Sequence, residues 1–188
     1  MPADADANRI AGLQALLQAQ RGKGPAPVDK WNPPYCGDIG MKIRADGVWL
    51  YQNSPIGRMP LVKLFAGVLR KDADGKHYLV TPVEKVDVAV EDAPFLAVEM
   101  EVQGSGREQH LVFRTNVDDI VTAGPGHPLR FAMDPVSEGL KPYLLVRGRL
   151  EALVTRALYY DLVELAVTDP QQGFGLWSGG TFVPMTAN

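Results

Sequence analysis

The sequence predicts an α+β fold built from two related, mostly antiparallel, β-rich domains, each with one main helix. Glycine (19) and proline (15) are abundant in a chain of 188 residues and together exceed the ~12 % that is usual, which indicates many turns. The apolar runs between these turns are short, and most connections lack the length of a helical crossover, which favours antiparallel strands. Apolar residues also recur at an offset of 97 positions (146 − 49), so that Trp49 aligns with Val146 and Leu79 with Leu176. Such an offset indicates an internal duplication.

The N-terminal residues are predicted to form an arm. Ile10, Leu13 and Leu17 lie on one face of a helix over residues 6–20, and a segment rich in glycine and proline follows directly. A helix this short needs a docking surface, either on the body of the protein or on a second copy. We therefore expect residues 1–30 to be a helical arm and linker.

The first half of the body is predicted to contain a hairpin, a helix and a series of strands. Asp46-Gly47 lies between two alternating apolar runs, which is a strong hairpin signal. Pro60 opens an apolar helical pattern that extends to Leu69. The strands expected after this helix are His77–Val83, Val86–Val90, Phe95–Val102 and Gln109–Arg114.

A second series of elements is predicted after Asn116. Apolar residues at helical spacing predict a helix over Leu150–Val167, which Asp169-Pro170 ends. The strands expected in this half are Ile120–Ala123, Leu129–Met133, Tyr143–Val146, Gly175–Ser178 and Thr181–Pro184. The predicted domains are accordingly residues 31–116 and 117–188.

Composition excludes several classes of protein. A net charge of −3 and a pI of about 5.6 argue against general binding to nucleic acids, because such proteins are usually strongly basic. No apolar run reaches 18 residues, which argues against a membrane span. The chain has one cysteine and an acidic start without a leader pattern. A cytoplasmic protein is the expectation.

The strong chemical motifs are not found. Histidines 77, 110 and 127 lie in separate segments without metal-ligand spacing, so no metal site is predicted. No phosphate-binding glycine loop occurs, no cofactor is expected, and no residue is assigned as catalytic. Cys36 is interpreted as a small packing residue, with a reactive thiol as the alternative.

An ordered set of short segments resembles a bacterial family known as domain of unknown function 1285. The segments are Trp31–Met41, Asp46–Gly47, Ser54–Arg58, Thr81–Val86, Glu91–Phe95, Arg114–Asn116, Gly124–Leu129, Tyr160–Leu165 and Trp177–Gly180. Gly40 departs from the resemblance, because a polar or acidic residue is expected there. The resemblance implies two domains that arose by duplication, the C-terminal half being loosely like a pleckstrin-homology barrel. It also implies a nucleotide-like ligand at the domain interface and a role in signal transduction.

The favoured function is a non-catalytic sensor that binds a small anionic ligand and has a protein partner in signalling. Cations at the ends of elements, next to hydroxyl and amide side chains, can hold a phosphate, and an aromatic ring can stack on a base. The predicted ligand-binding residues are Arg58, Thr81, Glu84, Lys85, Arg114, Thr115, Asn116, Trp177 and Ser178.

Two alternatives stay open. One is a hydrolase with Asp38 or Glu84 as general base, which predicts one of these carboxylates in a cleft beside a histidine or a second carboxylate. The other is a structural interaction module, with an edge strand or the Ile10–Leu17 helix as its contact surface.

Overall fold

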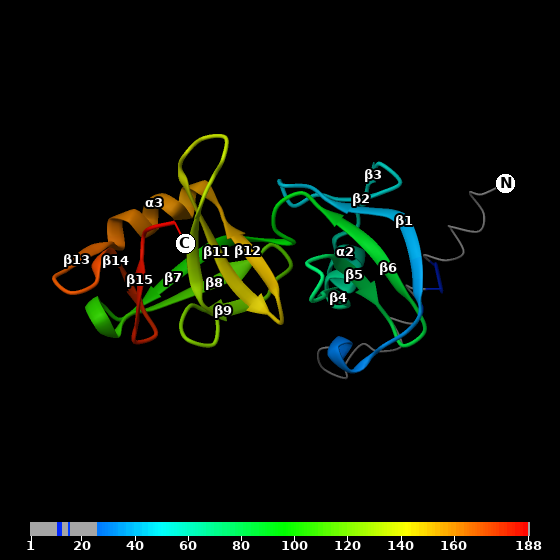
Figure 1. The fold of residues 1–188 in the computed structure, drawn as a ribbon, viewed down its shortest axis with the longest axis horizontal. Coiled ribbons are helices and arrows are strands. Elements are labelled where there is room, and N and C mark those ends of the chain that lie inside the picture. Colours follow the sequence, from blue (N-terminus) through cyan, green and yellow to red (C-terminus); the bar gives the residue numbers. More distant parts are fainter. Residues whose placement is uncertain (1–10, 13–14, 16–25, 188) are drawn as a thin grey trace. The chain divides into compact units, whose positions relative to one another are not determined.

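The computed structural model describes residues 11–12, 15 and 26–187, and the protein divides into two compact units (Figure 1). Met1–Glu91 is called the N-terminal unit, and Asp92–Asn188 the C-terminal unit. Each unit has one six-stranded mixed sheet and one α-helix among its described residues, and the C-terminal unit has a small third sheet. The α+β class is therefore confirmed. The predicted N-terminal arm falls mostly outside the described residues.

The sheet of the N-terminal unit has the strand order β3-β2-β1-β6-β5-β4. Its central pair, β1 and β6, is parallel, and the other neighbours are antiparallel. The elements are η1 (Val28–Lys30), β1 (Tyr35–Ile43), β2 (Trp49–Tyr51), β3 (Ser54–Pro55), α2 (Met59–Ala66), β4 (Leu69–Lys71), β5 (His77–Val80) and β6 (Lys85–Val90).

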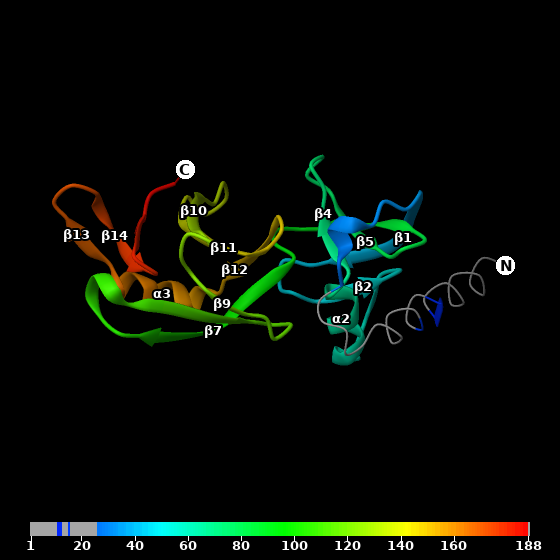
Figure 2. The ribbon, with the colours of Figure 1, turned by 90° about the horizontal axis from the view of Figure 1, so that it is seen from below.

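Helix α2 follows from a proline at its start and an apolar stripe along one side. Pro60 lies in the first turn, where its missing N–H costs nothing. Val62, Phe65 and Ala66 are buried, and the Phe65 ring stacks on Trp49 of β2 at 6.4 Å between centroids. Figure 2 shows α2 on one side of this sheet. The helix thus covers the apolar face of the sheet and leaves the other face to polar side chains.

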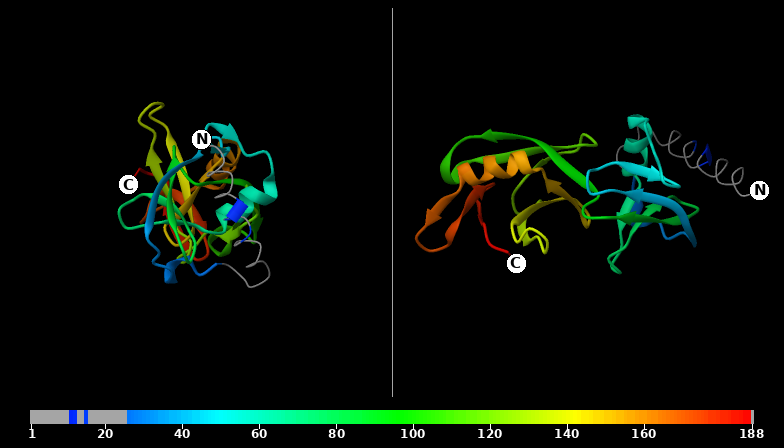
Figure 3. Two further views of the ribbon diagram at one scale, coloured as in Figure 1. Left: turned by 90° about the vertical axis from the view of Figure 1, so that its right-hand side faces the viewer. Right: turned by 90° about the horizontal axis from the view of Figure 1, so that it is seen from above.

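The sheet of the C-terminal unit has the order β10-β11-β12-β7-β8-β9, again with one parallel pair, β12 and β7, at its centre. Helix α3 packs along β7 (Figure 3). The elements are β7 (Phe95–Gln103), η2 (Gly106–Glu108), β8 (His110–Thr115), β9 (Ile120–Thr122), β10 (Leu129–Met133), β11 (Leu140–Arg147), β12 (Leu150–Val154), α3 (Arg156–Leu165), β13 (Val167–Asp169), β14 (Gly173–Ser178) and β15 (Thr181–Pro184).

The second helix is shorter than the sequence pattern predicts. Residues 150–154 form strand β12 instead, with Leu150, Ala152 and Val154 buried in alternation. Period-2 and helical spacing coincide over these few residues, and pairing with β7 and β11 decides between them. Neither α2 nor α3 has the length and apolar character that crossing a bilayer requires.

The two sheets have the same order of connections. In each unit, three consecutive strands form one half of the sheet, the next three form the other half, and the first and last strands pair in parallel. The first strand of each unit, β1 or β7, is nine residues long. The sequence offset of 97 positions does not relate equivalent strands. It aligns Leu79 in β5 with Leu176 in β14, and β14 belongs to the small sheet.

The boundary between the units also differs from the predicted one. The units divide between Glu91 and Asp92, whereas the predicted boundary after residue 116 lies in the turn between β8 and β9. The reason is long-range pairing. Phe95–Ala97 of β7 lie beside Ala152–Val154 of β12, so β7 and β8, which precede residue 116, belong to the second sheet. Local turn signals do not reveal such a pairing.

Candidate functional site

The parallel pair at the centre of the N-terminal sheet brings two carboxylates together. Asp38 of β1 lies opposite Asp87 of β6, and the register shifts on both sides of Asp38. Gly37 and Gly40 take positive φ angles of 89° and 79° around this irregularity, which glycine adopts readily. The Gly40 amide donates to Oδ1 of Asp38 at 2.7 Å.

Gly40 has a structural reason in this chain. Besides its positive φ, a Cβ atom at this position would lie 3.2 Å from Cγ of Gln52. A side chain here would therefore require Gln52 to move, in addition to the backbone strain. Position 40, where the family resemblance leads us to expect a polar or acidic residue, thus holds a glycine that permits the bulge at Asp38.

A hollow of about 370 Å³ lies beside this irregularity, within the N-terminal unit. Strand β6 continues beyond Val88, the residue that pairs with the first residue of β5, so the end of β6 and the β4–β5 turn form its walls. Its lining residues are Asp38, Gly75, Lys76, His77, Asp87, Val88, Ala89 and Val90. Two carboxylates and one ammonium group are thus among its lining residues, whereas His77 pairs with buried Val88, so its side chain lies on the opposite face of the sheet from Asp87.

Tyr35 connects the hollow with the polar face of the sheet. Its hydroxyl donates to Oδ2 of Asp87 at 2.6 Å, and this hydrogen bond raises the pKa of the tyrosine above its usual value. Its ring meets Tyr78 edge to face, with 6.3 Å between the centroids. More than half of the Tyr35 side chain is exposed, so its ring is accessible beside the hollow.

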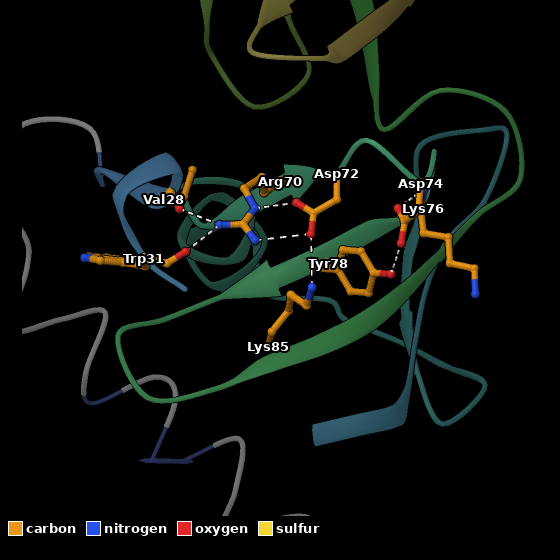
Figure 4. Close-up of polar contacts among 8 residues, drawn as sticks. All are labelled: Val28, Trp31, Arg70, Asp72, Asp74, Lys76, Tyr78 and Lys85. Carbon is orange, nitrogen blue, oxygen red and sulfur yellow. Dashed lines mark hydrogen bonds and ion pairs between the residues drawn. The ribbon is translucent and has the colours of Figure 1, made fainter. Parts of the chain in front are cut away.

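Arg70 is the centre of a polar network on this face (Figure 4). Its Nε and Nη2 donate to the two oxygens of Asp72 at 2.5 and 3.2 Å. Its Nη1 donates to the carbonyls of Val28 and Trp31 at 2.7 and 2.8 Å. The Arg70 side chain is only 13 % exposed, so it fastens η1 to β4 with charge-assisted bonds in a largely dry environment.

Tyr78 and Lys85 extend the network toward the hollow. The Tyr78 hydroxyl donates to Asp74 at 2.6 Å, which raises the tyrosine pKa to about 12 and lowers that of Asp74. Lys85 Nζ lies 3.1 Å from Asp72 and 4.4 Å from the centroid of Tyr78. Burial raises the pKa of Asp72, but the hydrogen bonds from Arg70 and Lys85 outweigh it and keep that pKa below its usual value.

One ring nitrogen of the partly exposed His77 is buried without a hydrogen bond. Among the described residues, its Nε2 has no partner. Burial, with a smaller contribution from nearby Lys71, lowers the pKa of His77 from 6.5 to about 4. The imidazole is therefore neutral at physiological pH.

Four of the predicted ligand-binding residues lie in the N-terminal unit. Buried Thr81 accepts hydrogen bonds from the amides of Val83 and Glu84, so its hydroxyl shapes the β5–β6 turn. Lys85 belongs to the polar network, and Arg58 is exposed at the start of α2. Glu84 lies outside the lining of the hollow, whereas Asp38, the other carboxylate predicted as a base, is part of it.

The other five lie in the C-terminal unit. Arg114 pairs with Glu99 and Asp118 at 2.7 and 2.8 Å. The buried hydroxyl of Thr115 accepts the amides of Val117 and Asp119. These contacts fix the turn that follows β8.

Asn116 and Ser178 bridge backbone segments. Asn116 Oδ1 accepts the amide of Leu96 at 3.0 Å. Ser178 accepts the amide of Leu111 and donates to Ala123, and Trp177 stacks against Arg107 at 5.1 Å. Ser178 meets the start of β8, and Arg114–Asn116 lie at its end, so the structure does not bring these two groups together.

Sequence reasoning missed Arg70, Asp72, Tyr78, His77 and Asp87. Each is an ordinary residue within a strand or turn, and only strand register brings it to the network or the hollow. One signal was available: Leu69-Arg70 and Tyr78-Leu79 recur as Leu129-Arg130 and Tyr143-Leu144.

The fold and this site define a two-unit, β-rich protein with a polar sheet face in its N-terminal unit. The model of the domain of unknown function DUF1285, N-terminal domain, matches residues 26–93. The model of the protein of unknown function DUF1285, C-terminal domain, matches residues 94–185. The chain belongs to the DUF1285 family.

Two solved structures of this family are similar to the chain. The DUF1285 family protein from Silicibacter pomeroyi DSS-3 is 48 % identical with a TM-score of 0.86, covering 93 % of this chain and 94 % of that one. The DUF1285 family protein from Shewanella baltica OS155 is 30 % identical with a TM-score of 0.52, covering 67 % and 91 %. No curated protein matches the chain.

The Arg70 network predicts a specific loss of stability. Arg70→Ala should lower the free energy of unfolding by about 3 kcal/mol, because in a largely buried place Asp72 loses two hydrogen bonds and keeps the one from Lys85, and the carbonyls of Val28 and Trp31 lose their bond from Arg70. Arg44→Ala is the matched control: it breaks a pair with Asp46 that is nearly half exposed and should cost less than about 1 kcal/mol. Urea denaturation measures both, and equal losses would contradict the account.

His77 predicts an acid-sensitive window of stability. The folded pKa of about 4 lies below the unfolded 6.5, so the unfolded chain binds more protons between these values. The contribution of His77 to the free energy of unfolding is therefore fully present above pH 6.5 and is lost as the pH is lowered to 4. The loss is on the order of 1 to 2 kcal/mol, because partial exposure of the side chain reduces the effect. His77→Gln should flatten this window and exposed His110→Gln should not. A slope that persists in His77→Gln would refute the assignment.

Proposed function

We propose that the protein is a non-catalytic ligand-binding protein whose site is the hollow beside Asp38 and Asp87. The hollow itself is the observation that carries the proposal: about 370 Å³ is within the range of small-molecule sites. Its lining residues combine acceptors and a cation, and the exposed ring of Tyr35 lies next to Asp87. The resemblance implies a site where two domains meet, whereas this proposal rests on residues of the N-terminal unit alone.

A nucleotide-like molecule suits this combination of groups. Asp38 and Asp87 can accept hydrogen bonds from ribose hydroxyls or base amino groups, as carboxylates do in dinucleotide sites. The exposed ammonium of Lys76 can pair with a phosphate, and Tyr35 can stack on a base. Lys85 and Arg114 are already paired with carboxylates, so they are weaker candidates for the phosphate.

A sensor function in signalling would follow from ligand binding that changes how the N-terminal unit meets a protein partner. Arg70 fastens η1 to the same face of the sheet. A ligand bound beside Tyr35 and Asp87 would lie close to this network, which supports the proposal that ligand and partner are coupled.

We also infer that the two units arose by duplication. The shared order of connections supports this inference, and so does the recurrence of a Leu-Arg pair opposite a Tyr-Leu pair. The loose likeness of the C-terminal unit to a pleckstrin-homology barrel, which the family resemblance implies, is kept as a proposal.

Thermal-shift screening of nucleotides, nucleosides and related compounds tests the ligand site. A true ligand raises the melting temperature by mass action. Asp38→Asn and Asp87→Asn should each weaken binding about tenfold to a hundredfold, because each replaces a charge-assisted hydrogen bond by a neutral one. Asp46→Asn, in an exposed turn, is the control and should bind like the wild type. Unchanged binding in both hollow variants would place the ligand elsewhere.

A hydrolase is the second candidate, and one observation favours it. Asp38 shares the hollow with a second carboxylate, Asp87, which is one of the two arrangements that this alternative requires. If a compound that stabilises the protein is also hydrolysed, Asp38→Asn should reduce kcat by at least about a hundredfold while the protein stays folded. Chromatographic analysis of the compound after incubation measures this. Intact compound with the wild type would reject hydrolysis of it.

A further inference from the structure

The two units carry the same arginine and tyrosine pair at equivalent places. Arg70 of β4 lies opposite Tyr78 of β5, and Arg130 of β10 lies opposite Tyr143 of β11. In both hairpins a buried leucine precedes the arginine and another follows the tyrosine: Leu69, Leu79, Leu129 and Leu144. Both arginines therefore lie on the sheet face opposite the leucine-lined core.

Both guanidinium groups use the same two nitrogens to hold a carboxylate. Arg130 donates from Nε and Nη2 to the two oxygens of Glu151, at 2.7 Å each. Arg70 donates from Nε and Nη2 to Asp72. This bidentate geometry fixes the plane of each guanidinium group and the direction in which Nη1 donates.

The third nitrogen differs between the units. Arg70 Nη1 donates to the main-chain carbonyls of Val28 and Trp31, at the two ends of the η1 turn. Arg130 Nη1 makes no hydrogen bond within the described part of the chain, and the Arg130 side chain is 43 % exposed. Its guanidinium carbon lies 4.5 Å from the ring centroid of Tyr143, which holds it in place.

We propose that Arg130 is the docking point for a protein partner that presents a 3-10 or α-helical turn with two accessible main-chain carbonyls. The η1 turn on Arg70 is the internal template for this contact. Leu145 and Leu153 lie on the same face as Tyr143 and are partly exposed, so a docked turn also finds an apolar surface. A helix end supplies such carbonyls because its last turn leaves them unsatisfied.

Charge favours a turn over an anion. Glu151 already neutralises Arg130 and lies within hydrogen-bonding distance of it. A phosphate or carboxylate at Nη1 would approach the Glu151 carboxylate and be repelled. A carbonyl dipole requires a donor without adding a negative charge, so it fits this site better.

The test uses the full chain and a synthetic peptide of its own residues 26–34, which contain the η1 turn. NMR of the arginine side chains follows a titration with the peptide to millimolar concentration. The expected result is a shift of the Arg130 signals, with binding at least tenfold weaker in Arg130→Lys. That variant keeps the positive charge but loses the planar set of guanidinium N–H donors. Exposed Arg149→Lys is the matched control and should bind like the wild type.

Three outcomes would overturn the proposal. They are the lack of any shift at Arg130 in the wild type, equal affinity in wild type and Arg130→Lys, and shifts produced by inorganic phosphate but not by the peptide. The last would assign Arg130 to an anion site instead. The wild-type spectrum decides the contact by itself, so the proposal stays testable even if Arg130→Lys does not fold.

Discussion

The parallel pairing of β1 with β6 is the constraint on which the N-terminal unit depends. These strands are the first and the last of the sheet in sequence, and only their pairing joins the two antiparallel halves of the sheet. The line along which β1 and β6 pair is called the seam. Burial of Ile43, Val86 and Val88 stabilises it, and this stabilisation must offset the entropy of closing a long loop. Asp38 and Asp87 meet only because this seam forms. The equivalent seam of β7 and β12 joins the C-terminal sheet in the same way.

A bulge in the seam links this constraint to the proposed ligand site. A regular parallel pair would present a flat ladder, whereas the register shifts around Asp38 bend the strand and leave space beside it. The glycines at 37 and 40 permit the bend through their positive φ angles. On the same face, the network around Arg70 satisfies its buried charges and holds η1 in place. The hollow thus lies in a surface that folding has already organised.

Local signals in the sequence predicted the α+β class, the abundance of antiparallel strands, the Asp46-Gly47 turn and the position of α2. These local signals do not predict which distant strands pair with one another or in which register. Residues 150–154 fit both periods, and the boundary between the units depends on the pairing of β7 with β12. The same limit applies to the site: Asp38 was identified as a carboxylate of interest, but Asp87 is 49 positions away (87 − 38) and nothing local links the two. The prediction of Thr81, Thr115 and Ser178 as ligand-binding residues rests on polar side chains near turns, and in the structure their hydroxyls make hydrogen bonds that stabilise those turns and strands.

The most direct measurement is a crystal structure of the protein grown with the compound that stabilises it most. The account predicts electron density for that compound in the hollow, in hydrogen-bonding contact with Asp38 and Asp87. Density for the compound at another place, with the hollow holding only solvent, would contradict the central claim that the β1–β6 seam creates the ligand site.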